Sequence, residues 1–339
     1  MVSVNLIEVK EEFSGIRLEA WFRDQYPNLS ITKIYKFIRT GQIRINGKRV
    51  KVGERVQTGQ TIRVPPLSFK EVEKKRFTSP VAISENKIKL IKDSIIHCDN
   101  DFLVLNKPAG LAVQGGSKVN VHVDAMLDHL KFEKSERPRL VHRLDKDTSG
   151  ALLLARSKKS SKLAMQYFQQ RIIRKLYWSI AVGIPKASDG FIEEKLIKTH
   201  TPSGERVVLD PLRGKPSRSL YKVLDMSGQS HSFLALEPLT GRTHQLRVHL
   251  SEILKTPILG DGKYGGKNAY LKNNSGKIGL CLHCRALRIP SKFSSFIDVY
   301  APIPKSFSEF CNYFGFETLS SFDHFLKHQN DYNRFDTKC

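Results

Sequence analysis

One acidic residue on a short turn is the part of this sequence that most directly implies chemistry. Asp145 lies in the segment HRLDKDTSG, residues 142–150, which runs without a break into the apolar stretch 151–155. A turn that ends in glycine and is anchored on a buried strand holds a side chain in a fixed position. The pattern predicts an enzyme that presents the Asp145 carboxylate to its substrate, braced by the neighbouring Arg143.

A tyrosine on a predicted strand is the second candidate. Residues 175–183, KLYWSIAVG, alternate as a strand does, which puts Leu176 and Trp178 on one face. Tyr177 then lies on the other face, beside the small Ser179 and Ala181. An aromatic ring over small neighbours leaves room for a flat ligand, such as a nucleobase, to stack on it. The alternative is an ordinary half-buried strand tyrosine.

The third candidate is an arginine in the segment GRTHQLRVH, residues 241–249, which opens a predicted helix over residues 244–254. Leu246 and Leu250 belong to the apolar face of this helix, and Arg247 is rotated about 100° from Leu246. A guanidinium there can hold a buried carboxylate ionised through charge and bidentate hydrogen bonds. By itself, an arginine near a helix start is more often exposed and solvated.

The charge of the chain narrows the class of partner. Its 339 residues include 56 Lys and Arg against 33 Asp and Glu, a formal net charge of +23. Such an excess is typical of proteins that bind phosphate backbones, so we expect nucleic acid as the partner. An anionic membrane surface is the alternative, but the apolar runs are far shorter than the roughly 20 residues that a bilayer span needs.

The N-terminal residues and the cysteines indicate the cellular compartment of the protein. The first residues lack the apolar core of a signal peptide, and Glu8, Glu11 and Glu12 argue against a transit peptide, so we expect a cytoplasmic protein. The chain has five cysteines without the spacing of a disulfide framework. We expect them to be reduced thiols.

A small basic module is predicted at the N-terminus, and it begins with an amphipathic helix. Ser30 is placed as an N-cap and Gly41 as a C-terminal cap. The apolar positions of the helix have the spacing i, i+3, i+4, i+7; they are Ile31, Ile34, Tyr35 and Ile38. A stripe of cations on another side consists of Lys33, Lys36 and Arg39.

A basic hairpin follows this helix. Residues 43–45 and 48–52 alternate as strands, and Asn46-Gly47 supplies a two-residue turn. The hairpin adds the cations Arg44, Lys48 and Arg49. Together with the helical stripe they predict an RNA-binding surface, and the alternative is that they only form a solvated face.

The chain is predicted to contain two domains. The first module covers residues 1–65, a linker or connecting strand pair covers residues 66–90, the catalytic domain covers residues 91–315, and a C-terminal tail covers residues 316–339. After residue 95, short strands such as 102–105 dominate, with a helix over about residues 159–173. We therefore predict an α+β fold with a mostly antiparallel mixed sheet, and a short helix and frayed end in the tail.

Taken together, these motifs resemble a known family. The strings HRLDKDTSG, KLYW and GRTHQLRVHL, in this order, resemble the RluA family of pseudouridine synthases over almost the whole chain to about residue 315. Residues 14–64 resemble an S4 RNA-binding module of α/β type, although Glu19 and Trp21 depart from the usual Asp and Leu. The strings NKPAG, VQGGS and VPP are most similar to the RluC branch, which modifies uridines of large-subunit ribosomal RNA.

The resemblance implies a role for each candidate. Asp145 is then the catalytic aspartate, Tyr177 stacks on the target uracil, and Arg247 pairs with the aspartate. The resemblance implies isomerisation of uridine to pseudouridine. This reaction conserves the atoms, so we expect no cofactor and no metal, and we expect base flipping because a uridine in structured RNA must be unstacked before an acid can reach its sugar. We expect a monomer. Whether Asp145 acts as nucleophile or as base stays open. The residues that we assign to RNA and substrate binding are His142, Arg143, Lys33, Lys36, Arg39, Arg44, Lys48, Arg49, Arg242 and His244.

Three other interpretations remain at this stage. The segment Cys281-Leu282-His283-Cys284 has zinc-ligand character, but no second pair stands nearby, and its alternation favours a buried strand. Asp145 and Asp147 could form the carboxylate pair of a glycosidase, although residues two apart on a turn rarely oppose each other across a substrate. The third is a ribosome-binding assembly factor in which these motifs serve only as scaffold.

Overall fold

A computed structural model describes residues 4–26, 28–67, 83–115, 121–201, 204–271, 278–291 and 295–319. The chain divides into two compact units, Met1–Ala82 and Ile83–Cys339. This division falls inside residues 66–90, where the sequence predicts a linker. None of the helices in the described ranges is long and apolar enough to cross a bilayer.

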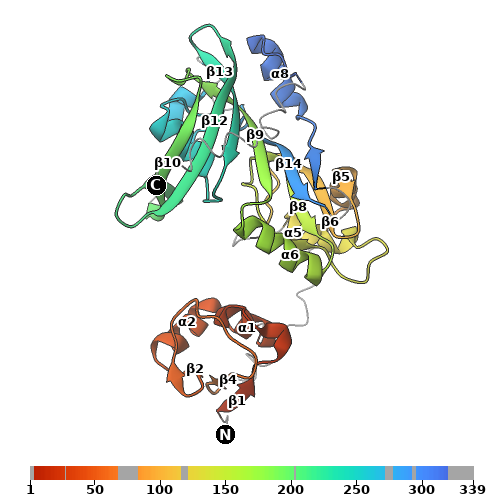
Figure 1. Ribbon diagram of the computed structural model, residues 1–339, viewed down its shortest axis with the longest axis vertical. Coiled ribbons are helices and arrows are strands. Elements are labelled where there is room, and N and C mark those ends of the chain that lie inside the picture. The colour runs from red at the N-terminus through yellow and green to blue at the C-terminus, as the bar shows by residue number, and fades with distance from the viewer. Residues whose placement is uncertain are drawn as a thin grey trace. The chain divides into compact units, whose positions relative to one another are not determined.

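Among its described residues, 4–26 and 28–67, the first unit has a four-stranded sheet and two α-helices (Figure 1). The strand order is β1-β4-β2-β3, and every pairing in it is antiparallel. Its core includes Leu18, Trp21, Phe22, Ile34 and Ile62. The elements are β1 (Asn5–Glu8), a 3-10 turn (Glu11–Phe13), α1 (Leu18–Gln25), α2 (Ile31–Arg39), β2 (Arg44–Ile45), β3 (Lys48–Arg49) and β4 (Thr61–Val64).

The ends of α2 and the turn after it are confirmed, but its buried face is not the predicted one. The Ser30 hydroxyl accepts a hydrogen bond from the Lys33 backbone N–H, and Gly41 has a φ of +69° just after the helix. Asn46 and Gly47 adopt the positive φ angles of a two-residue hairpin turn. The structure buries Ile34, Phe37 and Ile38 and leaves Ile31 and Tyr35 exposed, because the buried stripe is centred on Phe37.

The second unit is built on an eleven-stranded sheet (Figure 1). Among the strands that the structure describes, all ladders are antiparallel except the parallel pair of β8 and β14, so the predicted mixed, mostly antiparallel sheet is confirmed. Its main order is β11-β10-β12-β13-β9-β14-β8-β6-β5, with β7 beside β8 and β15 beside β14. The strands are β5 (Ile95–Cys98), β6 (Phe102–Lys107), β7 (Arg139–Leu140), β8 (Ser149–Ala155), β9 (Arg174–Val182), β10 (Asp189–Thr201), β11 (Gly204–Leu209), β12 (Lys215–Ser227), β13 (His231–Pro238), β14 (Leu282–Pro290) and β15 (Phe296–Tyr300).

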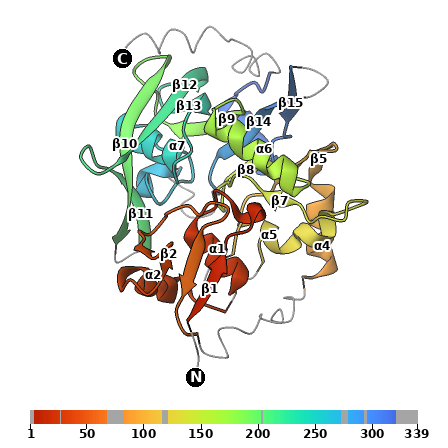
Figure 2. The same ribbon diagram turned by 60° about the horizontal axis from the view of Figure 1, so that its bottom comes forward.

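Short helices cover this sheet, and α6 packs against β8 (Figure 2). The predicted helix over about 159–173 is confirmed but ends earlier, at Gln169, after starting from a capping box of Ser157 and Ser160. The helix predicted over 244–254 consists of an α-helical turn followed by a π-helical segment. The helices are α4 (Glu85–Asp93), α5 (Val123–Met126), α6 (Lys158–Gln169), α7 (Gln245–Val248), the π segment (His249–Ile253), α8 (Lys305–Phe314) and 3-10 turns at Leu127–Leu130 and Gly266–Ala269.

Two predicted segment boundaries differ from those of the structure. Part of the predicted linker, from Glu85 onward, is the start of α4, whose Ile91 is fully buried. Periodicity was weak there because only one residue of the helix is buried. The short helix predicted within the tail, residues 316–339, falls mainly outside the described residues, which end at residue 319. Before the tail lies a helix that the sequence did not predict, α8.

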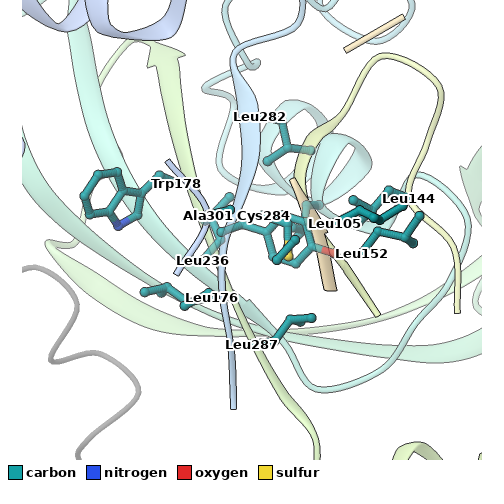
Figure 3. Close-up of a cluster of buried hydrophobic side chains, with 14 of the residues drawn as sticks. Leu105, Leu144, Leu152, Leu176, Trp178, Leu236, Leu282, Cys284, Leu287 and Ala301 are labelled. Carbon is teal, nitrogen blue, oxygen red and sulfur yellow. The ribbon is translucent and has the colours of Figure 1, made fainter. Parts of the chain in front are cut away.

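Leucine and aromatic side chains from the central strands fill the core of the second unit. Figure 3 shows Cys284 among Leu105, Leu152, Leu176 and Leu236, all of them buried. Trp178, on the other side of β9 from Tyr177, meets Phe233 edge-on at 5.3 Å. The strand that carries Tyr177 is therefore packed on both faces.

The close approach of β8 and β14 at the start of β8 generates a prediction. Gly150 has a φ of +106°, and a Cβ there would lie 2.7 Å from the Cys284 backbone nitrogen and closer still to its carbonyl oxygen. We expect Gly150→Ala to lower the free energy of unfolding by about 3 kcal/mol or more, from strain and overpacking together. Urea denaturation measures it. Gly279 is exposed, and a Cβ added there would lie in open space, so Gly279→Ala should change the free energy of unfolding by less than about 0.5 kcal/mol. Equal changes in the free energy of unfolding for the two variants would contradict this explanation.

Candidate active site

Asp145 lies on the turn between β7 and β8, where a buried neighbour and a backbone bond hold it. The Leu144 side chain is buried, and the Thr148 N–H donates to the Asp145 carbonyl at 3.2 Å. The Asp145 side chain is 22% exposed and lines a cavity together with Tyr177, His244 and Arg247. The structure thus brings the three residues predicted to be catalytic into one cavity.

A buried lysine that the sequence analysis did not single out holds this turn in place. Lys107, at the end of β6, is fully buried, and its ammonium donates to the carbonyls of Pro108 at 2.8 Å, Leu111 at 2.9 Å and Lys146 at 3.0 Å. Burial lowers the pKa of Lys107 to about 8, although the nearby Asp145 and Asp147 carboxylates oppose that shift. The lysine ties the Asp145 turn to the loop after β6.

Arg247 lies beside Asp145, but its main partner is another acid. Its Nε donates to Asp261 Oδ2 at 2.8 Å and its Nη2 to Asp261 Oδ1 at 2.7 Å. The remaining nitrogen, Nη1, lies 3.9 Å from Asp145 Oδ2. Burial acts to lower the pKa of Arg247, but the hydrogen bonds and charge of Asp261 outweigh it and leave the pKa raised. Arg247 is therefore a fixed cation beside Asp145.

Asp261 was missed in the sequence analysis. It is 1% exposed and lies in the segment GDGKYGG, an acid between glycines after an apolar stretch. An acid between two glycines is the sequence signal that could have pointed to it.

His244 approaches Asp145 from the start of α7. Its backbone is left-handed, with a φ of +51°, which is uncommon for a residue other than glycine. Its Nε2 lies 3.8 Å from Asp145 Oδ2, and its Nδ1 shares a hydrogen bond of 2.7 Å with the Tyr264 hydroxyl. Burial lowers the pKa of His244 below its ordinary value, and the Asp145 carboxylate acts against that shift. The imidazole ring of His244 is therefore neutral at pH 7.

Tyr177 forms part of the cavity wall. It is 7% exposed and pairs across the sheet with Cys284 of β14. Burial raises the pKa of Tyr177 well above its ordinary value, and the Cys284 thiol, to which it is hydrogen-bonded, and the Asp145 charge act in the same direction. The phenol is therefore neutral, which suits it to stacking better than to proton abstraction.

The remaining predicted residues of this unit have distinct environments. His142 accepts a hydrogen bond from the Leu153 N–H at 2.8 Å, and burial lowers its pKa to about 3, so it is a neutral support of the turn. Arg143 is exposed and lines the cavity. Arg242 is exposed as well, and its Nε donates to the Pro216 carbonyl at 3.0 Å.

The predicted cations of the first unit lie on its surface with one exception. Arg44 is half-buried, and its guanidinium donates to the Gly41 and Gly47 carbonyls at 3.1 and 3.2 Å, so it stabilises the hairpin. The exposed ones are Lys33, Lys36, Arg39, Lys48 and Arg49.

The cysteine pair considered for zinc does not converge on one point. His283 hydrogen-bonds the Ser149 hydroxyl at 2.9 Å and the Ala301 carbonyl at 3.1 Å, while Cys284 is bonded to Tyr177. Burial raises the pKa of Cys281 and Cys284, so both stay protonated thiols. In the described ranges, no group of three or more His, Cys, Asp or Glu side chains is placed to hold a metal ion.

Comparison with known proteins gives consistent matches. Residues 101–252 match the RNA pseudouridylate synthase family, and residues 16–62 match the S4 domain. Ribosomal large subunit pseudouridine synthase C of Vibrio vulnificus is 34% identical over 287 residues, 84% of this chain and 88% of that protein. The protein of the same name from Escherichia coli K12 is 32% identical, with the same coverage. The solved structure of human RNA pseudouridylate synthase domain containing 4 has a TM-score of 0.59 and 28% identity, covering 69% of this chain and 97% of that one.

The buried pair beneath Asp145 generates a second prediction. We expect Asp261→Asn to lower the free energy of unfolding by about 3 kcal/mol or more, because it leaves the Arg247 charge buried without its partner. Thermal or urea unfolding measures it. The matched control is Asp298→Asn, which breaks a bidentate pair with Arg288 of similar geometry but greater exposure, at 15% and 22%. That change should cost about 1 kcal/mol. Equal losses would mean that burial of the pair does not set its energy.

Proposed function

The chain belongs to the RNA pseudouridylate synthase family, and we propose that it isomerises uridines of large-subunit ribosomal RNA to pseudouridine. Both named bacterial relatives are large-subunit synthases, and each alignment covers more than four fifths of both chains. The observation that carries the proposal is the cavity that holds the Asp145 carboxylate against the fixed Arg247 cation, with Tyr177 in its wall. We propose Asp145, Tyr177 and Arg247 as the catalytic residues.

The reaction requires one ionised acid near the sugar of the target nucleotide. The bond between C1′ and N1 breaks, the uracil rotates, a bond forms between C1′ and C5, the C5 proton leaves and N1 gains a proton. Asp145 serves either as a nucleophile at C1′ or as a base toward a sugar proton. In both roles the positive charge of Arg247, 3.9 Å from Asp145 Oδ2, attracts the Asp145 carboxylate.

Confinement of the detached uracil falls to Tyr177. The ring of the base has to turn within the cavity without leaving it, and a flat aromatic neighbour supports this by stacking. The hydrogen bond with Cys284 and the packing of β9 on both faces support a fixed ring orientation.

RNA reaches this cavity through positive surface. A hollow of about 880 Å³ lies against Asp145, and basic residues outnumber acidic ones in its wall. The basic residues are Arg143, Lys146, Lys198, Arg206, Arg247 and Lys263, and the acidic ones are Asp145, Asp147 and Glu205. The S4 module adds the exposed cations of α2 and the hairpin, which we assign to RNA affinity. A uridine in structured RNA must be flipped out to reach Asp145, at a cost of a few kcal/mol that phosphate contacts offset. The enzyme would act as a monomer in the cytoplasm and without a cofactor.

The decisive experiment is mapping of pseudouridine in large-subunit ribosomal RNA by carbodiimide labelling, in cells with and without this protein. We expect at least one pseudouridine to disappear without the protein, to return with the wild type, and to stay absent with Asp145→Asn, with a rate loss of at least about 1000-fold. Retained RNA binding by Asp145→Asn distinguishes catalysis from folding. Unchanged modification with Asp145→Asn would support a scaffold protein instead, and aniline-sensitive abasic sites would indicate a glycosidase.

Tyr177 allows a graded test of stacking. Tyr177→Phe keeps an aromatic ring and Tyr177→Leu does not, so we expect the leucine variant to have the lower single-turnover rate constant, by about 10-fold or more. Single-turnover pseudouridine formation on an unmodified ribosomal RNA transcript measures this. Equal rates for the two variants would show that stacking by the ring is not what Tyr177 contributes.

A further inference from the structure

A second groove opens beside the catalytic cavity, between the end of α6 and the loop after β13. Its volume is about 530 Å³, within the range of about 300 to 1,000 Å³ typical of ligand sites. We call it the flanking groove. It shares lining residues with the catalytic cavity, among them Arg143, Lys175 and Arg242, so the two spaces adjoin. Phe168, Ile173 and further apolar side chains form part of its wall.

The charges of this groove favour a phosphate at its rim. Among the described residues that line it, five are basic and one, Glu237, is acidic. Arg174 and Glu237 neutralise each other through two hydrogen bonds of 2.7 and 2.8 Å in the floor. The rim arginines Arg143 and Arg171 are exposed, and their side chains have no ion pair or hydrogen bond within the described part of the chain.

The backbone at Arg171 is a second observation. Helix α6 ends at Gln169, and two residues later the chain makes a left-handed turn, with a φ of +59° at Arg171 and a hydrogen bond from the Ile172 N–H to the Tyr167 carbonyl at 2.9 Å. That position usually holds glycine, and a larger side chain there is strained. A strained residue whose side chain has no partner in the fold is an expected sign of a binding role.

We propose that the flanking groove binds the RNA nucleotide next to the target uridine, with its phosphate on Arg171 and Arg143 and its base against the apolar wall. This inference rests on the proposed function. When the target uracil occupies the catalytic cavity, the chain on one side of it continues past Arg143 into the flanking groove. Arg171 is then a substrate-binding residue and takes no part in bond making.

The test uses two variants that keep the left-handed turn, Arg171→Gly and Arg171→Asn, since both residues tolerate a positive φ. On an unmodified ribosomal RNA transcript we expect KM to rise about 3- to 10-fold with kcat within about 2-fold of wild type, and the salt slope of RNA binding to fall by about 1. The melting temperature should be equal or higher, since strain is relieved. The control is Lys305→Ala, a cation on α8 that is 92% exposed and outside the groove.

Photocrosslinking locates the bound nucleotide. With benzoylphenylalanine at Gln169, an exposed groove residue, we expect crosslinks within one or two nucleotides of the modified uridine. The inference is overturned if the wild type forms pseudouridine but the Arg171 variants match Lys305→Ala, or if crosslinks fall elsewhere. A wild type that forms no pseudouridine would overturn the proposed function and this inference with it.

Discussion

The site depends on the buried ion pair of Arg247 with Asp261. If Arg247 gave its bidentate face to Asp145, the reacting carboxylate would be occupied by hydrogen bonds. Asp261 takes that face, so Arg247 contributes charge at 3.9 Å without blocking the Asp145 oxygens. Two unit charges at that separation attract by about 1 kcal/mol in water and about 4 kcal/mol near a protein surface. Because the Asp145 side chain is 22% exposed, the energy of its attraction to Arg247 lies between these two values.

Such a pair is maintained for geometry more than for stability. Removing two charges from water costs several kcal/mol per ion, so a buried pair is often no better than apolar residues of the same size. What it supplies is a guanidinium in one orientation, further restrained by the Tyr264 ring, 5.1 Å from the guanidinium carbon. Lys107 likewise supplies a cation in a fixed position near Asp145, because its ammonium donates hydrogen bonds to three carbonyl groups.

The sequence predicted the parts of this site that local pattern controls. The Asp145 turn, the Tyr177 strand and the start of the Arg247 helix each have a periodic apolar partner, so their elements could be placed. The buried partners of these residues could not be predicted from the sequence, because Asp261 and Lys107 come close to the site only once the sheet has folded. His142 illustrates the same limit, since its role as a neutral acceptor depends on a backbone N–H of β8. The face of α2 was misjudged for a similar reason, as the buried centre at Phe37 follows from tertiary packing.

An acidic reaction centre within a strongly basic protein has a physical rationale. A lone carboxylate would repel an approaching phosphate backbone, and the cost would rise as water left the cavity. Here the buried Arg247 and Lys107 act on Asp145 from within the fold, while Lys263 and Arg143 are exposed beside it. The local field therefore stays positive although the reacting group is negative. The same cations that surround the Asp145 carboxylate also attract the strand that carries its substrate, so affinity and reactivity come from one arrangement of charge.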